Sequence, residues 1–199
     1  MVKPKKNDEL KRIIELPEGI EARVEGKEII MKTGEAQIKR KIDVVEIKIE
    51  GKNIVISAQR TTKKERKMIS TYTAHIRNMI KGLKEKYLYK LKVCNVHFPM
   101  TVSVDKAKNE LIVKNFLGEK QQRKAKILEG VEVKVEGAVI TVESHDKEKA
   151  GQTAANFEKA TKVRLRDRRI FQDGIFLTEK PGVIIWEPSR EKAGISIRD

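Results

Sequence analysis

A thirteen-residue pattern occurs twice in this chain, at 45–57 (VEIKIEGKNIVIS) and at 131–143 (VEVKVEGAVITVE). In each copy, apolar and charged residues alternate, a Glu-Gly pair interrupts them, and the alternation resumes. This period of two is typical of two half-buried strands joined by a tight turn, in which glycine adopts backbone angles that other residues avoid. A repeat of this kind predicts a duplicated folding unit.

The residues ahead of each copy also follow a common order. A first hairpin is predicted over 20–31, with a third Glu-Gly turn, and its counterpart is predicted over 102–113. The stretches after these hairpins, 33–41 and 116–126, are polar, and we expect both to be loops.

A helix is predicted after each copied hairpin. Thr62 and Glu65 have the spacing of a capping box, and an apolar stripe with helical spacing comes after them. This stripe consists of Met68, Ile69, Tyr72, Ile76, Met79, Ile80 and Leu83. The second helix is expected from about Asp146, which suits an N-cap. Its inner face carries the mostly small residues Ala150, Ala154, Phe157 and Thr161, so it should approach its sheet closely.

These elements predict an α+β protein of two tandem similar domains, each with antiparallel sheets (two hairpins) packed on one α-helix. We expect a basic N-terminal arm at 1–15, a first β/α repeat at 16–86, a second β/α repeat at 87–177, and a C-terminal extension at 178–199. Within the extension, 183–186 (VIIW) is apolar and could be a short strand or a docking patch.

The charge balance points to a polyanionic partner. The 199 residues include 44 Lys and Arg against 29 Asp and Glu, a net charge of +15. Nucleic acid is the first candidate and an anionic membrane surface the second. We set the membrane aside because no apolar run is long enough to span a bilayer and no helix combines an apolar face with a basic rim. The single cysteine, Cys94, excludes an intrachain disulfide and favours an intracellular setting.

The sharpest local feature is a basic stretch at the end of the second helix. Most charge runs are solvated faces, but here arginine outnumbers lysine, and arginine makes forked contacts to phosphate. We therefore interpret the stretch as a phosphate-binding segment. Its cations are Lys159, Lys162, Arg164, Arg166, Arg168 and Arg169.

Two further basic segments have an alternative interpretation of equal weight. The stretch 114–126 places Lys120, Arg123 and Lys124 beside Phe116, and it is either an RNA contact or a mobile hairpin connection. The N-terminal arm is either a solvated tail or a segment that binds RNA.

Catalytic chemistry finds little support. His75, His97 and His145 are scattered, and Cys94 near His97 lacks the further ligands that zinc requires. Nucleotide-binding loops and paired-cysteine motifs are absent from the sequence. We predict no enzyme, no cofactor and no metal. Since aromatic residues make up only 5% of the chain, binding should involve phosphates and sugars of folded RNA.

Six motifs occur in a characteristic order: 75–82 (HIRNMIKG), 89–93 (YKLKV), 97–99 (HFP), 115–120 (NFLGEK), 151–156 (GQTAAN) and 166–174 (RDRRIFQDG). Together with the duplicated layout, they resemble the large-subunit ribosomal protein L6 family in its archaeal and eukaryotic form. The resemblance covers the chain from about Leu16 to Pro181.

The resemblance implies a structural constituent of the large ribosomal subunit in the cytoplasm, monomeric outside the ribosome. It implies binding to large-subunit rRNA near the sarcin–ricin loop and the stalk base, beside neighbouring large-subunit proteins that include stalk-base proteins. The family has neither catalytic residues nor a cofactor, and its loop after the second helix supplies most RNA contacts. The candidate rRNA-binding residues are Lys162, Arg164, Arg166, Arg168, Arg169, Gln172 and Gly174, with Lys120, Arg123 and Lys124 from the second basic segment.

A second hypothesis is an RNA-modifying or RNA-processing enzyme that holds its substrate on the same basic surface. Such an enzyme requires a cleft with a perturbed titrating group or a metal ion.

Overall fold

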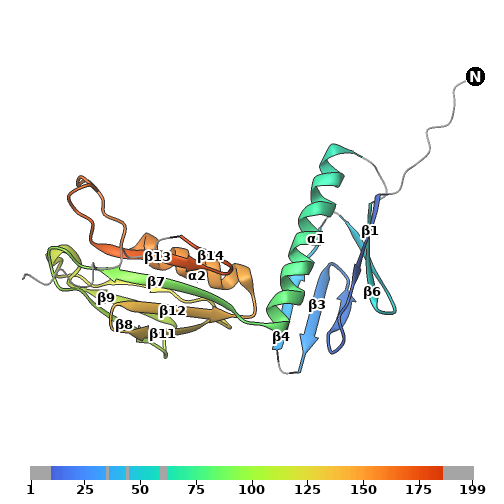
Figure 1. Cartoon of the computed structure of the whole chain (residues 1–199), viewed down its shortest axis with the longest axis horizontal. Coiled ribbons are helices and arrows are strands. Elements are labelled where there is room, and N and C mark those ends of the chain that lie inside the picture. The colour runs from blue at the N-terminus through green and yellow to red at the C-terminus, as the bar shows by residue number, and fades with distance from the viewer. Residues whose placement is uncertain (1–9, 35, 44, 59–61, 186–199) are drawn as a thin grey trace, which may run out of the picture. The chain divides into compact units, whose positions relative to one another are not determined.

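The structure is a computed structural model that describes residues 10–34, 36–43, 45–58 and 62–185. The chain divides into two compact units. The first comprises Met1–Lys86 with His145–Lys147, and the second comprises Tyr87–Ser144 with Glu148–Asp199. Each unit contains antiparallel sheets and one main helix (Figure 1). The predicted α+β class is confirmed.

The first unit contains two three-stranded sheets, ordered β2-β3-β4 and β1-β6-β5, and the helix α1. The elements are β1 (Leu10–Glu15), β2 (Glu21–Glu25), β3 (Glu28–Thr33), β4 (Ala36–Lys41), β5 (Glu46–Glu50), β6 (Asn53–Ala58) and α1 (Lys63–Lys84). Helix α1 begins with the predicted capping box: the Thr62 hydroxyl accepts the Glu65 N–H at 3.3 Å, and the Glu65 carboxylate accepts the Thr62 N–H at 3.0 Å. Apolar side chains from both sheets and from one face of α1 form the core of the first unit.

The second unit repeats this layout and extends it. Its sheets are ordered β10-β9-β8 and β11-β12-β7-β13-β14. The elements are β7 (Tyr87–Cys94), β8 (Thr101–Asp105), β9 (Glu110–Lys114), η1 (Phe116–Gly118), β10 (Arg123–Lys126), β11 (Glu132–Glu136), β12 (Val139–Ser144), α2 (Lys147–Ala160), β13 (Gly174–Lys180) and β14 (Val183–Ile184).

Three hairpins share one turn, as the Glu-Gly pairs predict. Gly26, Gly51 and Gly137 come directly after the last glutamate of β2, β5 and β11, with φ of 59°, 60° and 58°. A two-residue hairpin loop favours turns with positive φ at the first position, which glycine adopts at little cost. The structure confirms the two hairpins that the repeated pattern predicts, β5–β6 and β11–β12.

Helix α2 packs closely on its sheet, in agreement with its small residues. Ala150, Ala154 and Phe157 are buried, and a Cβ added at Gly151 would lie 3.1 Å from the Tyr89 hydroxyl oxygen. A larger residue at Gly151 would push the helix away from β7. Burial raises the pKa of the Tyr89 hydroxyl.

Two predicted loops contain strands instead. Residues 36–41 form β4 and residues 123–126 form β10, each paired to only one neighbouring strand. Each buries one side chain, Ile38 in β4 and Ala125 in β10, so neither shows the alternation that predicts a strand.

Both ends of the chain also differ from the prediction. Leu10–Glu15, assigned to the N-terminal arm, pairs with β6 as strand β1, and residues 1–9 lie outside the described residues. At the other end, β13 runs through residue 178 and β14 pairs with it, so the proposed extension begins inside a sheet. Residues 183–184 are a short strand, and Trp186 lies outside the described residues.

Candidate nucleic-acid interface

The predicted phosphate-binding stretch lies in a loop between α2 and β13, residues 161–173, which we call the basic loop. Figure 1 shows this loop projecting from the second unit in orange to red. It starts at Thr161, a buried residue whose hydroxyl accepts the N–H of Ile175 at 2.9 Å. This bond joins the start of the loop to the strand at its end.

The far end of the basic loop is fixed by a buried carboxylate. Asp173 is 3% exposed, and its Oδ1 accepts the N–H groups of Val96 and His97 at 2.7 and 2.9 Å. Its Oδ2 lies 2.6 Å from Nδ1 of His97. Burial by itself raises the pKa of Asp173, but the bonds from His97 and Val96 outweigh it, so the pKa lies below its ordinary value. We call this arrangement the His97–Asp173 clamp.

A stack of side chains extends from the clamp into the loop. The His97 ring packs on Phe171, with ring centroids 4.8 Å apart and planes inclined by 26°. The Arg166 guanidinium carbon lies 4.8 Å from the centroid of the same Phe171 ring. The contact orients a guanidinium whose donors stay available, because an aromatic face accepts a cation without using its N–H groups for ordinary hydrogen bonds.

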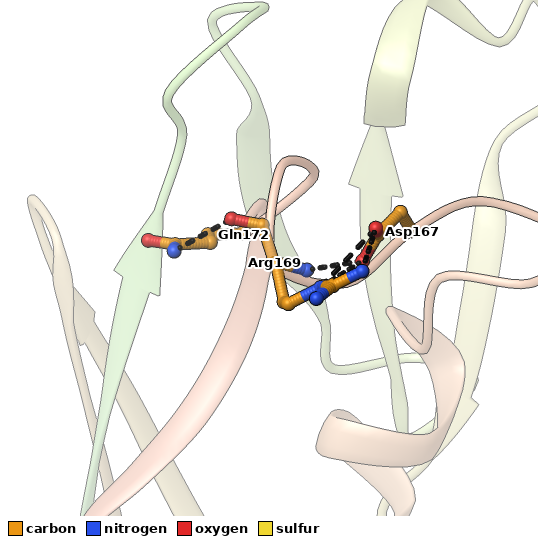
Figure 2. Close-up of polar contacts among 3 residues, drawn as sticks. All are labelled: Asp167, Arg169 and Gln172. Atoms are coloured by element: carbon orange, nitrogen blue, oxygen red, sulfur yellow. Dashed lines mark hydrogen bonds and ion pairs between the residues drawn. The ribbon is translucent and has the colours of Figure 1, made fainter.

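Within the loop, Asp167 closes a turn (Figure 2). Its carbonyl accepts the N–H of Phe171 at 2.9 Å, and its carboxylate accepts the N–H and guanidinium of Arg169, both at 2.9 Å. Gln172 donates its amide to the Arg169 carbonyl at 3.0 Å. The side-chain and backbone bonds from Arg169 lower the pKa of Asp167. Since exposed ion pairs are weak, this pair shapes the turn without removing Arg169 from reach of a phosphate.

The remaining cations of the loop are exposed. These are Lys162, Arg164, Arg166 and Arg168, and the side chain of Arg169 is 89% exposed. Among the residues that the structure describes, Arg164 and Arg168 form no ion pair. The loop therefore presents guanidinium groups that can form forked hydrogen bonds to phosphate.

The second basic segment meets the base of the basic loop through Arg123. The Arg123 guanidinium forks onto Glu119 at 2.6 and 2.8 Å, donates to the carbonyls of Ala160 and Lys162, and lies 4.2 Å from the Phe116 centroid. The bond from Arg123 lowers the pKa of Glu119. These contacts engage the Arg123 guanidinium inside the second unit, where it joins the second basic segment to the base of the basic loop.

The other candidate rRNA-binding residues are either exposed cations or residues that shape the loop. Lys120 is exposed, and Nζ of Lys124 lies 3.7 Å from a Glu110 carboxylate oxygen. Gly174 is buried with φ of 152°, and a Cβ there would lie 3.3 Å from the Thr161 carbonyl oxygen. Gly174 and Gln172 therefore shape the loop, while the exposed lysines and arginines are able to bind an anion.

Two comparisons relate the chain to known proteins. A family model described as Ribosomal protein L6 matches residues 16–86 and 98–174. The protein named large ribosomal subunit protein uL6 from Methanococcus vannielii is 45% identical over 174 residues, which cover 86% of this chain and 94% of that protein. The chain belongs to the ribosomal protein L6 family. The two matched ranges correspond to the two units, and the second ends at Gly174, immediately after the basic loop.

Two of the six sequence motifs contain the clamp residues, but the sequence does not predict that these residues pair. His97 belongs to the motif at 97–99, and Phe171 and Asp173 belong to the motif at 166–174. His97 and Asp173 lie 76 residues apart, so no local spacing joins them. The signal that could have found them is the presence of an acidic residue directly before a strand that begins with buried residues.

The described residues give no support for a metal site, a membrane-spanning helix or a reactive thiol. They contain no group of three or more His, Cys, Asp or Glu side chains placed to hold a metal ion. None of their helices is long and apolar enough to cross a membrane. Burial raises the pKa of the Cys94 thiol, which disfavours the reactive thiolate.

Proposed function

We propose that this chain is a structural constituent of the large ribosomal subunit and that its basic loop binds large-subunit rRNA. The observation that carries the proposal is the set of exposed arginines on a loop held at both ends by buried hydrogen bonds. Membership of a ribosomal protein family and the name of the Methanococcus relative support it. The second unit is then the main rRNA-binding domain.

The site of binding is inferred from the family resemblance. It is the region of the sarcin–ricin loop and the stalk base, where neighbouring large-subunit proteins share the surface. The working location is the cytoplasmic ribosome. Lys120 and Lys124 extend the cationic surface beside the basic loop.

The geometry favours recognition by shape. Because the clamp already orders the loop backbone, binding does not have to order it, and each phosphate that is neutralised releases counterions. Affinity should therefore fall steeply with salt and depend weakly on base identity at the contacted phosphates.

Charge reversal tests the loop directly. Arg164→Glu combined with Arg168→Glu changes two exposed residues with no ion pair of their own in the described chain. Loss of two phosphate contacts, with added repulsion, should weaken binding to an archaeal rRNA transcript spanning the sarcin–ricin loop and stalk base by about a hundredfold or more. Filter binding at fixed salt measures the change, and footprinting of the wild-type complex locates the contact.

The matched control reverses two exposed arginines of α1, Arg66→Glu and Arg77→Glu, which gives the same change in net charge. Its affinity should stay within a few-fold of the wild type, and both variants should retain the wild-type circular dichroism. Equal loss in both variants would mean that total charge, and not the basic loop, determines binding.

The enzyme hypothesis gains no support from the clamp. His97 and Asp173 resemble a general base and its orienting carboxylate, but both Asp173 oxygens hold the loop, and His97 is stacked on Phe171. A nucleophile hydrogen-bonded to His97 is absent from the described residues, and such a partner is what a base of this kind requires.

A further inference from the structure

Leu165 of the basic loop has an apolar side chain that cannot form a hydrogen bond or an ion pair with a phosphate. Leu165 lies between Arg164 and Arg166 and is fully exposed, with a relative accessibility of 107%. Its backbone is left-handed, with φ of 57°. A leucine avoids this conformation because its Cβ approaches the following carbonyl oxygen. The loop therefore holds a large apolar side chain in water, in a strained conformation, at its most cationic point.

The folded unit itself explains neither the exposure of this apolar side chain nor the strain in its backbone. A side chain with full exposure contributes no burial to the core, and Asn or Gly would adopt the same backbone angle with less strain. Strained residues that persist in a structure concentrate at binding sites. The stack of Arg166, Phe171 and His97 supports the loop next to Leu165.

The chemistry of leucine restricts what it can contact. It has neither donor nor acceptor, so it gains free energy only by removing apolar surface from water. The minor groove of an RNA duplex presents 2′-hydroxyls and base edges, which are polar. The face of an unstacked base is apolar, and enzymes that extrude bases pack apolar side chains against that face. Arg164 and Arg166 on either side can hold the phosphates that flank such a nucleotide.

We propose that Leu165 packs against the face of an unstacked nucleotide in the rRNA, so that the basic loop selects a bulge or loop nucleotide within an otherwise shape-recognised site. This inference rests on the proposed rRNA-binding function. It adds an apolar determinant to that function, which the phosphate contacts alone do not supply. An RNA partner is favoured over a protein because exposed cations flank Leu165 on both sides in the sequence.

The test is Leu165→Asn in the full chain, with the same rRNA transcript as the probe. Asparagine tolerates the left-handed backbone and has a polar side chain. Loss of one apolar contact should weaken binding about tenfold, which is about 1.4 kcal/mol. The dependence of affinity on salt should keep its wild-type slope, because no phosphate contact is removed. The matched control is Ile184→Asn on β14, an exposed apolar residue outside the loop, which should bind like the wild type.

Each other outcome overturns the inference. Wild-type affinity of Leu165→Asn for the transcript would show that the leucine makes no RNA contact. If that variant bound the transcript normally but entered large subunits poorly, the partner would be a neighbouring protein. A weaker affinity with a shallower salt slope would mean that Leu165 only positions the arginines. Failure of the wild-type protein itself to bind the transcript would instead refute the proposed function.

Discussion

The two units share one module and differ in the chain that comes after the helix. The order β1-β6-β5 in the first unit corresponds to β7-β12-β11 in the second, and β2-β3-β4 corresponds to β8-β9-β10. After α1 the chain passes within two residues into β7. After α2 it forms the basic loop and then β13, which pairs with the edge of β7 that faces away from β12. The strand β1 has no such neighbour among the described residues.

This difference separates the fold from the binding site. A duplicated module accounts for the hairpins, the helices and both cores, and it requires no exposed arginine cluster. The exposed arginines proposed to bind rRNA lie in the basic loop, which the second unit inserts between α2 and the added strand β13. The basic loop depends on the clamp, which joins residues 76 apart in the sequence.

The largest expected effect on stability comes from Asp173→Ala. It leaves the N–H groups of Val96 and His97 without their acceptor, and a lost bond to a charged group combined with an unsatisfied donor costs about 2–4 kcal/mol. Urea unfolding of the second unit measures this. The control in the first unit is Asp43→Ala, which removes an exposed carboxylate and should cost about 0.5 kcal/mol or less. Similar costs for both would show that the clamp does not stabilise the fold.

A smaller effect is expected from Gly174→Ala. The added Cβ meets the Thr161 carbonyl oxygen and the Phe176 ring at 3.3 Å, at a φ of 152° that only glycine adopts easily. We expect a loss of about 2 kcal/mol in the free energy of unfolding and a weaker affinity for rRNA, because the base of the basic loop shifts. Gly137→Ala, with no atom near its Cβ, should cost about 1 kcal/mol and leave the affinity unchanged. Equal affinity of the two variants for rRNA would show that the base of the basic loop does not affect binding.

The smallest expected effect is a difference in acid stability. The pKa of Asp173 is depressed in the folded state, against about 3.9 when unfolded. Its contribution is therefore complete above the unfolded pKa and is lost as the pH falls from about 4 through the folded pKa. The free energy of unfolding of Asp173→Asn should lie below that of the wild type at pH 7, and the gap should narrow below about pH 4. A gap that stays constant with pH would mean that the carboxylate charge is not involved.

The sequence predicted the local features and missed those that join distant segments. The repeated hairpins and the capping box were predicted because their signals lie within a few residues, as at Gly51 and Thr62. Strands β4 and β10 were missed because each buries one side chain, and pairing with a neighbouring strand overrides their polar composition. The arginines of the basic loop were identified from composition. The clamp and the exposure of Leu165 depend on tertiary contacts, which no spacing in the sequence reveals.

The central claim is that the insertion in the second unit, and not the net charge, binds rRNA. The most direct test replaces Arg164, Arg166 and Arg168 with glutamine and compares this variant with Lys63, Lys64 and Lys67 replaced by glutamine on α1. Both variants lose three positive charges at exposed positions. A plot of log affinity against log salt has a negative slope, to which each phosphate contact contributes about 0.7–0.9 in magnitude. We predict that the arginine variant reduces the magnitude of this slope by about 2–3 and that the lysine variant keeps the wild-type slope. Equal slopes in the two variants would contradict the claim.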